Sequence, residues 1–257
     1  MTEKSFIQHI VGFISAIENE QGPLLDELAL KCAKARKNGG LIHLFGSGHS
    51  VIPTMDAYPR YGSFVGIHPI FDPRLMWHNV LGPGGVRELL WLERTENYIF
   101  QVLQNEPINS GDILIALSHG GTNIAAIEAA EYANKKGCFT IGITSMKNAD
   151  AASKHSRGLK LSTVVDQVID TGVPVEDAVY NVESWSRPVG GSSTIVATVI
   201  VQELITRIAK ALGEMGMEVP TFVSPTVPGA SVSSNDEVFL EHAKYLHAAV
   251  GVSLGAK

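Results

Sequence analysis

Short apolar segments of strand length alternate with longer segments of helical period along most of this chain. Residues 41–45, 112–118 and 138–144 are mostly apolar, and each gives way to glycine, serine or threonine. Such runs are typical of strands buried on both faces of a parallel sheet. Residues 124–136 place apolar side chains at helical spacing, and Gly137 follows as a stop signal. This alternation predicts β-α-β units, which means a parallel sheet with helices on both faces.

Two less regular segments complete the expected sheet. Residues 63–70 and 164–170 also carry apolar side chains between turn residues, and residues 192–212 form a long amphipathic segment after the last of them. We therefore predict a doubly wound, three-layer α/β/α sandwich with a five-stranded parallel sheet. In such sheets ligands bind beyond the carboxyl ends of the strands, where the strand order reverses.

We expect a single domain of 257 residues, which is enough chain for one large core. A helical arm covers about 1–38, the sheet core about 39–212, and a C-terminal extension with a short helix about 213–257. Within the arm, Gly22 and Pro23 predict a break between two helices, because proline removes a helical hydrogen bond. The proline-containing extension is expected to pack on the domain or to be partly mobile.

Composition and charge exclude several classes of protein. The chain is 45% hydrophobic with a net charge of −6, and aromatic residues are only 7%, which argues against a nucleic-acid-binding surface. No apolar stretch approaches the roughly 18 residues of a membrane span, and no signal-peptide cleavage pattern is present. We therefore expect a cytoplasmic protein without nucleic-acid or membrane partners. Cys32 and Cys138 are interpreted as buried reduced thiols, and the nine histidines lack ligand spacing, so no metal or cofactor is expected.

Three turns rich in glycine and hydroxyl side chains stand where strands give way to helices. They are residues 46–50 (GSGHS), 118–123 (SHGGTN) and 190–194 (GGSST). Glycines allow close backbone approach, free N–H groups point at an anion, and hydroxyls complete its shell, so these turns favour phosphate binding. The alternatives are ordinary tight connections for the first two turns and helix N-capping for the third. The predicted binding residues are Gly46, Ser47, Gly48, Ser50, Ser118, His119, Gly120, Gly121, Thr122, Asn123, Ser192, Ser193 and Thr194.

The order of these strands, turns and helices over residues 36–212 resembles the SIS (sugar isomerase) domain family, with a layout similar to its phosphoheptose isomerase branch. The resemblance implies phosphosugar binding and a homodimer or homotetramer with sites near subunit interfaces. Families of this kind include aldose–ketose isomerases, an etherase acting on muramic acid phosphate, and regulators that only sense the ligand.

The first turn matches the family pattern Gly-x-Gly-x-Ser through Gly46, Gly48 and Ser50. In the second turn, Ser118 and Gly121 match the family's phosphate loop, whereas Gly120 stands where a serine is expected. Asn123 replaces the final hydroxyl of that loop, and the neighbouring Thr122 is a substitute for it.

Moving a carbonyl between two sugar carbons through an enediol needs a base and a proton shuttle. Our candidates are Asp56, Glu183, His49 and His78. Asp56 inherits the acid/base role that the family resemblance implies for a carboxylate on the first helix after the sheet begins. For each candidate the alternative is structural: a helical Asp, a solvated Glu or a surface His.

The leading functional hypothesis is an aldose–ketose isomerase that acts on a sugar phosphate by acid/base catalysis. An amino-sugar phosphate deaminase or lyase, and a non-catalytic phosphosugar sensor, remain the alternatives.

Overall fold

The computed structural model describes residues 4–253, so the ends of the expected single domain, 1–3 and 254–257, lie outside the described part. Five parallel strands form the central sheet: β1 (Ile42–Gly46), β2 (Ile67–Ile70), β3 (Ile113–Leu117), β4 (Phe139–Thr144) and β5 (Gln167–Asp170). Their order across the sheet is β2-β1-β3-β4-β5. The predicted α/β class and the five-stranded parallel sheet are confirmed.

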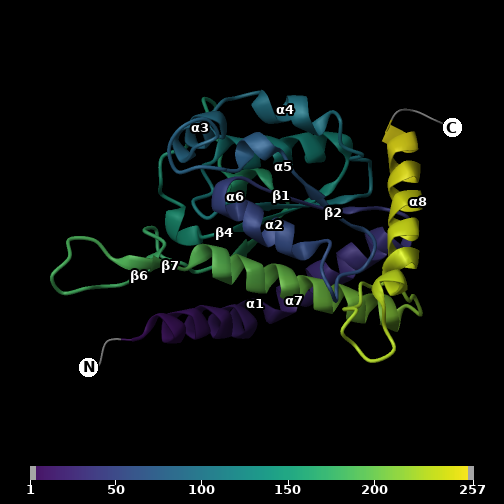
Figure 1. The fold of residues 1–257 in the computed structure, drawn as a ribbon. Helices are drawn as coiled ribbons and strands as arrows, with labels where there is room; N and C mark the ends of the chain where they lie inside the picture. Colours follow the sequence, from purple (N-terminus) through teal and green to yellow (C-terminus); the bar gives the residue numbers. More distant parts are fainter. Residues whose placement is uncertain (1–3, 254–257) are drawn as a thin grey trace.

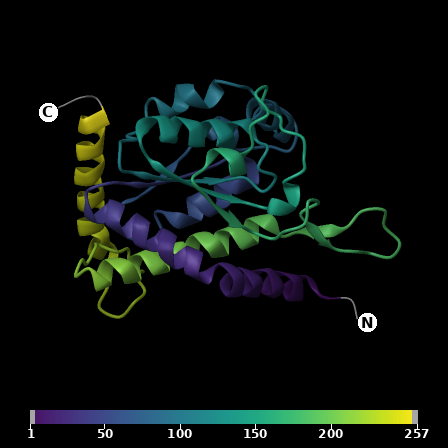
Figure 2. The same cartoon turned by 180° about the vertical axis from the view of Figure 1, so that it is seen from behind.

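Helices cover both faces of this sheet, as Figures 1 and 2 show. One face carries α1 (Phe6–Lys37), α2 (Val51–Ala57) and α7 (Ser193–Glu214). The other carries α3 (Val86–Leu92), α4 (Tyr98–Leu103), α5 (Ile124–Lys136) and α6 (Leu161–Val164). Because side chains alternate along a strand, Leu44 packs in the core under α1 and α7, whereas Phe45 packs in the core under α5.

The long first helix corrects one prediction, because α1 does not break at Gly22 and Pro23. Local propensity disfavours proline there, but tertiary contacts hold the helix together on both sides of it. Arg207 of α7 donates to the Gly22 carbonyl at 3.0 Å, and Gln21 donates to the Asp170 carbonyl at 2.7 Å. Packing along the whole of α7 therefore outweighs the missing proline N–H.

Two predicted strands are shorter than expected. The second begins only at Ile67, because Gly66 has a φ of +115° and the Val65 N–H bonds to Pro220 instead of joining the sheet. The fifth begins at Gln167, because the start of the expected segment ends the short helix α6. Short 3₁₀ turns complete the connections: η1 (Gly48–Ser50), η2 (Pro73–Leu75), η3 (Met146–Asn148) and η4 (Val232–Asn235).

Two features outside the sandwich differ from the predictions, which included no hairpin and only a short C-terminal helix. An antiparallel hairpin of β6 (Ala178–Tyr180) and β7 (Val189–Gly191) projects from the body next to the start of α1 (Figure 1). At the opposite end stands α8 (Asp236–Ser253), which is much longer than the short helix predicted there (Figure 2). Within residues 4–253, no helix combines the length and the apolar character that a bilayer crossing requires.

The strand order reverses between β1 and β3, which lie side by side in the sheet. Chain direction leads from β1 outward to β2, and from β3 outward in the opposite sense to β4 and β5. Gly46 pairs with Leu117 at the carboxyl ends of the two central strands. The turns after these strands therefore meet at the position where doubly wound sheets bind ligands.

Candidate functional site

A cavity of about 260 Å³ opens at the carboxyl ends of β1 and β3. It is lined by both of the first two predicted turns and by the connection from residue 77 to residue 94. The predicted binding residues that line it are Ser47, Gly48, Ser50, Ser118, His119, Gly120, Thr122 and Asn123, together with the predicted catalytic residue His49. The topology thus brings together two turns that lie some seventy residues apart in the sequence.

The tight shape of both turns depends on glycine. A Cβ on Gly46 would lie 2.2 Å from the Ser50 carbonyl oxygen, so a larger residue would push the first turn open. Gly121 has a φ of +62°, and a Cβ there would lie 2.9 Å from Oγ1 of Thr144. Both positions therefore require glycine for backbone reasons, and the result is a pair of compact turns with small side chains facing the cavity.

The second turn leads directly into α5. Asn123 is the N-cap of this helix, because its Oδ1 accepts a hydrogen bond from the Ala125 N–H at 3.1 Å. The positive end of the α5 dipole consequently lies at the cavity wall beside Gly120 and Thr122. This placement suits an anionic group of a ligand.

A buried carboxylate that the sequence reasoning missed lies in the same cavity. Glu93 follows α3, is only 8% exposed, and lines the cavity between the two turns. Its Oε2 accepts hydrogen bonds from the Ser47 hydroxyl at 2.9 Å and from Asn123 Nδ2 at 2.7 Å. Among the described residues, no side chain or backbone group donates to its other oxygen, Oε1. One carboxylate oxygen is thus fixed by the turns, and the other is available to a ligand.

One sequence signal pointed to Glu93 in retrospect. It lies four residues after Leu89 and therefore on the same helical face, which is the buried one. A carboxylate that continues an apolar helical face is expected to be buried, and its burial costs free energy unless hydrogen bonds compensate. Such a carboxylate inside a long connection is therefore a candidate functional group. The sequence alone shows neither the Ser47 hydroxyl nor the Asn123 amide that satisfy it.

Two histidines also face the cavity. The ring of His49 packs on that of Trp77 with 4.3 Å between centroids. His119 makes one long contact, 3.4 Å from Nε2 to the Val175 carbonyl, and its Nδ1 is buried without a partner among the described residues. Both imidazoles therefore belong to the cavity wall.

The third predicted turn meets the first two in an adjoining crevice. Ser193 and Thr194 at the start of α7 line it together with Ser50 and Ser118, and its free volume is only about 10 Å³. Ser192 points elsewhere: its hydroxyl donates to the Asp177 carbonyl at 2.8 Å. Of the three residues of this turn, Ser192 therefore makes a local hydrogen bond, whereas Ser193 and Thr194 lie at the crevice beside the cavity.

Three of the predicted catalytic residues lie outside the cavity lining. Asp56 pairs with Arg60 and accepts a hydrogen bond from Gln202 at 2.8 Å. His78 is exposed and lies 3.2 Å from the Pro73 carbonyl, and Glu183 is exposed in the connection between β6 and β7. Within one subunit these side chains do not join His49 at the cavity, and their catalytic roles stay predictions.

The remaining reactive groups are cations and thiols. Arg94 and Lys154 line the cavity, and neither forms an ion pair with another residue of the described chain. Burial raises the pKa of Cys32 and of Cys138 to about 12, so these free thiols are poor nucleophiles. No group of three His, Cys, Asp or Glu side chains within residues 4–251 is arranged to hold a metal ion.

Comparison with known proteins places this chain in a family. The model of the SIS domain matches residues 5–145. A UPF0309 protein of Halalkalibacterium halodurans is 34% identical over 227 residues, 88% of this chain and 89% of the relative. A UPF0309 protein of Geobacillus thermodenitrificans is 36% identical over 226 residues, with coverage of 88% and 89%.

Among solved structures, a phosphoheptose isomerase from Neisseria gonorrhoeae has a similar fold. The TM-score is 0.51 at 14% sequence identity, over 79% of this chain and 94% of that one. At this identity the likeness concerns the fold alone. The chain is similar over most of its length to UPF0309 proteins, and it belongs to the SIS domain family.

Proposed function

We propose that the protein binds a sugar phosphate in the cavity between the first two turns and interconverts its aldose and ketose forms. The observation that carries this proposal is the Glu93 carboxylate, which is buried, oriented by Ser47 and Asn123, and open to the cavity through Oε1. A base fixed beside two anion-binding turns is the combination that an enediol reaction on a phosphosugar needs.

In the proposed reaction, Glu93 Oε1 removes the proton from the carbon next to the carbonyl, and the electron pair forms the enediol double bond. Returning that proton to the former carbonyl carbon completes the isomerisation. A second group must move a proton between the two oxygens, and His49 and His119 are the titratable side chains on the cavity wall that suit this task. No redox partner is consumed, because the sugar is oxidised at one carbon and reduced at the next.

The phosphate end of the ligand would lie at the second turn. Gly120 and Thr122 line the cavity there beside the first turn of α5, and the Ser118 side chain adds a hydroxyl. Asn123, which replaces the hydroxyl of the family loop, bonds instead to Ser47 and Glu93. In this proposal its task is to orient the base rather than to bind phosphate.

A thermal-shift screen against pentose, hexose, heptose and amino-sugar phosphates identifies the ligand, and chromatography of the product mixture identifies the reaction. With the isomerised sugar in hand, Glu93→Gln is expected to reduce kcat by about 10³-fold while binding is retained, since general base catalysis contributes 10²–10⁴-fold.

Asp56→Asn is the matched comparison, because it removes a carboxylate outside the cavity. Loss of turnover in Asp56→Asn with normal turnover in Glu93→Gln would assign the catalytic base to Asp56 on α2. Ligand binding without turnover of any phosphosugar would identify a sensor, and release of ammonia or of a cleaved product would identify a deaminase or lyase.

We also propose that two or more copies associate, since apolar side chains gather at one end of the molecule. Ile7 and Val11 on α1 and Trp185 in the hairpin are more than half exposed. They belong to one region, because a Cβ on Gly190 of β7 would lie 2.9 Å from the ring of Phe6. An interface here would cover this apolar surface. Sedimentation velocity measures the mass of the assembly directly.

A further inference from the structure

The loop that carries Lys154 runs from β4 to α6 along the rim of the cavity. Lys154 lines the cavity with Arg94, which belongs to the turn between α3 and α4. The two turns expected to bind phosphate supply N–H groups and hydroxyls but no formal positive charge. A lysine at this rim can supply it, provided that the loop holds it there.

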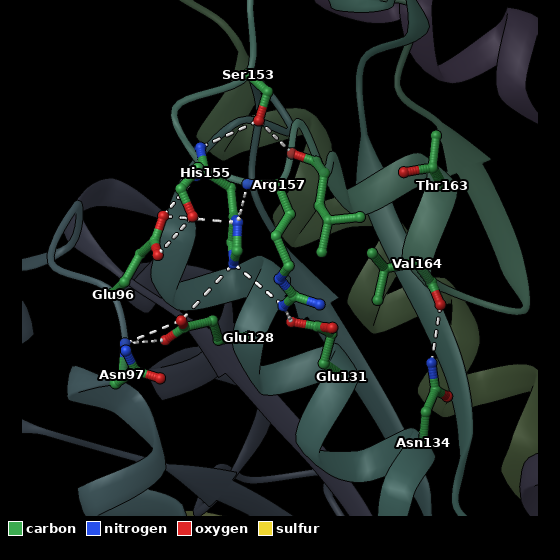
Figure 3. Close-up of polar contacts among 12 residues, drawn as sticks. Glu96, Asn97, Glu128, Glu131, Asn134, Ser153, His155, Arg157, Thr163 and Val164 are labelled. Carbon is green, nitrogen blue, oxygen red and sulfur yellow. Dashed lines mark hydrogen bonds and ion pairs between the residues drawn. The ribbon is translucent and has the colours of Figure 1, made fainter.

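His155, the next residue, is buried under this loop, with a side chain only 2% exposed. Its Nδ1 lies 3.6 Å from Oε1 of Glu96, and its Nε2 lies 3.8 Å from Oε1 of Glu128. Figure 3 shows the imidazole between these two carboxylates, one from the α3–α4 turn and the other from α5. The imidazole is therefore packed between three segments that surround the cavity, with both carboxylates beyond hydrogen-bond distance.

The same carboxylates bind the backbone on either side of the imidazole. Glu96 accepts from the Ser156 N–H at 2.5 Å and from the Ser156 hydroxyl at 2.9 Å. Both oxygens of Glu128 lie 2.9 Å from the Asn97 N–H. The loop is thus bound to the α3–α4 turn, and that turn is bound to α5. Glu93 and Arg94 lie just before these anchored residues in the same turn.

An ion pair closes the cluster on its outer side. Arg157 pairs with Glu131 of α5, and the Arg157 N–H donates to His155 Nδ1 at 3.1 Å (Figure 3). No residue of this cluster lines the cavity, whereas Lys154, the sequence neighbour of His155, does. The cluster therefore acts on the cavity only through the backbone that it fixes.

We propose that this cluster holds Lys154 in place to bind the phosphate of the ligand, with Lys154 as a binding residue and His155 as a positioning residue. The inference rests on the proposed phosphosugar binding and adds to it a charged side chain of the protein that binds the ligand. Lysine has a flexible stem, so an anchored backbone reduces the conformational entropy that is lost when its ammonium binds an anion. Charge-assisted hydrogen bonds to phosphate are about twice as strong as neutral ones, so a lysine held at this position strengthens phosphate binding.

The first test removes the charge. Inorganic phosphate and glucose 6-phosphate are the probes, and isothermal calorimetry gives their Kd values. Lys154→Gln is expected to weaken binding of the sugar phosphate by about 10-fold or more. Lys147→Gln is the control, since Lys147 is an exposed lysine of the same connection that does not line the cavity. Equal affinities of Lys154→Gln and wild type would overturn the proposal.

The second test asks whether His155 acts through Lys154. His155→Ala is expected to weaken binding about fivefold in the wild-type background and to have no further effect in Lys154→Gln, whereas independent structural damage would be additive. His155→Gln, which retains a hydrogen-bonding group near Glu128, should recover part of the affinity. Glu131→Gln breaks only the outer ion pair of the cluster, so it should weaken binding less than His155→Ala does. Additive effects of the two substitutions would contradict a positioning role.

A third measurement keeps the result separate from the proposed function. Hydrogen exchange of the peptide covering 153–157 should become at least about 10-fold faster in His155→Ala and in Glu96→Ala, and should change less in Glu131→Gln. Glu96→Ala acts on a partly exposed side chain, so it remains informative if His155→Ala does not fold. Wild type that binds neither probe nor any phosphosugar of the thermal-shift screen would refute phosphate binding at Lys154 together with the proposed function. Unchanged exchange in folded variants would refute the anchoring itself.

Discussion

The two ends of the sheet each hold a buried, hydrogen-bonded carboxylate, but only one of these carboxylates lines a cavity. At the carboxyl end, Glu93 keeps one oxygen without a donor among the described residues and faces an open cavity. At the amino end, Asp112 has three donors: the Leu41 N–H at 2.8 Å, the Asn109 N–H at 2.8 Å and His43 Nε2 at 3.0 Å.

The amino end is also covered. Tyr245 of α8 lies 3.2 Å from the Arg36 and Gly40 carbonyls, and the Arg36 guanidinium stacks on its ring at 3.9 Å. Asn109 donates to the Ala249 carbonyl of the same helix at 3.0 Å. A carboxylate stabilises the fold when its oxygens accept hydrogen bonds and a helix packs over it. A carboxylate left open to a cavity is instead available for chemistry.

Removing the carboxylate at the amino end should produce the largest change in stability. Asp112→Ala leaves His43 Nε2 and two backbone N–H groups buried without their acceptor, so we expect the free energy of unfolding to fall by about 4 kcal/mol. Urea denaturation measures it, and Asp150→Ala, at an exposed position, is the control. Turnover per folded molecule should stay normal. A large loss of turnover in folded Asp112→Ala would break the distinction between the two ends.

Acid should weaken the amino end as well. Burial, with smaller effects of His43 and His242, lowers the pKa of His68 from 6.5 to about 3. Between these values the unfolded chain binds a proton that the folded chain does not, so stability falls as the pH drops below 6.5. We expect a loss of about 2 kcal/mol at roughly pH 5.

Glu106, 3.3 Å from His68, acts in the opposite direction. Burial raises the pKa of its carboxyl, so its contribution is present at low pH and is lost as the pH rises through the raised pKa. His68→Asn removes the imidazole that binds a proton only in the unfolded chain. It should therefore reduce the loss of stability between pH 7 and 5, measured by denaturation at each pH. An unchanged pH dependence in this variant would assign the acid sensitivity to other groups.

The smallest effect on stability is expected at the carboxyl end. In Ser47→Ala, Glu93 loses one donor but keeps Asn123, so stability should change by less than about 1 kcal/mol. Turnover should nevertheless fall about 10-fold, because the base is less firmly oriented. Ser63→Ala is the matched control: Ser63 is also buried, and its hydroxyl bonds to the Arg60 backbone away from the cavity. Equal turnover in the two variants would remove Ser47 from the proposed mechanism.

Local pattern predicted the frame of this molecule well, because burial imposes it directly. Strands form within residues 112–118 and 138–144, as their short apolar runs between turn residues predicted, and Gly137 ends α5 in the left-handed conformation that glycine favours. The same reasoning failed at Pro23, where contacts to α7 outweigh a local preference.

The site was only partly accessible to such reasoning. The turns at 46–50 and 118–123 are visible as glycine and hydroxyl patterns, and the reversal of strand order places them side by side. Lys154 carries no pattern of its own, and the helical face that Glu93 shares with Leu89 does not reveal the groups that bind Glu93, because these neighbours are distant in sequence.

The sequence by itself determined the α/β class, the parallel sheet and the two turns, because strand burial and glycine backbone geometry are local properties. Only the tertiary structure decided which carboxylate lies among the turns. Ser47, Glu93 and Asn123 come from three separate segments, and their hydrogen bonds exist only after the sheet and α3 have packed together. The same holds for His155, whose two carboxylate neighbours lie on different elements. Chemistry at this site depends on distances between side chains, and these distances are set by packing rather than by pattern.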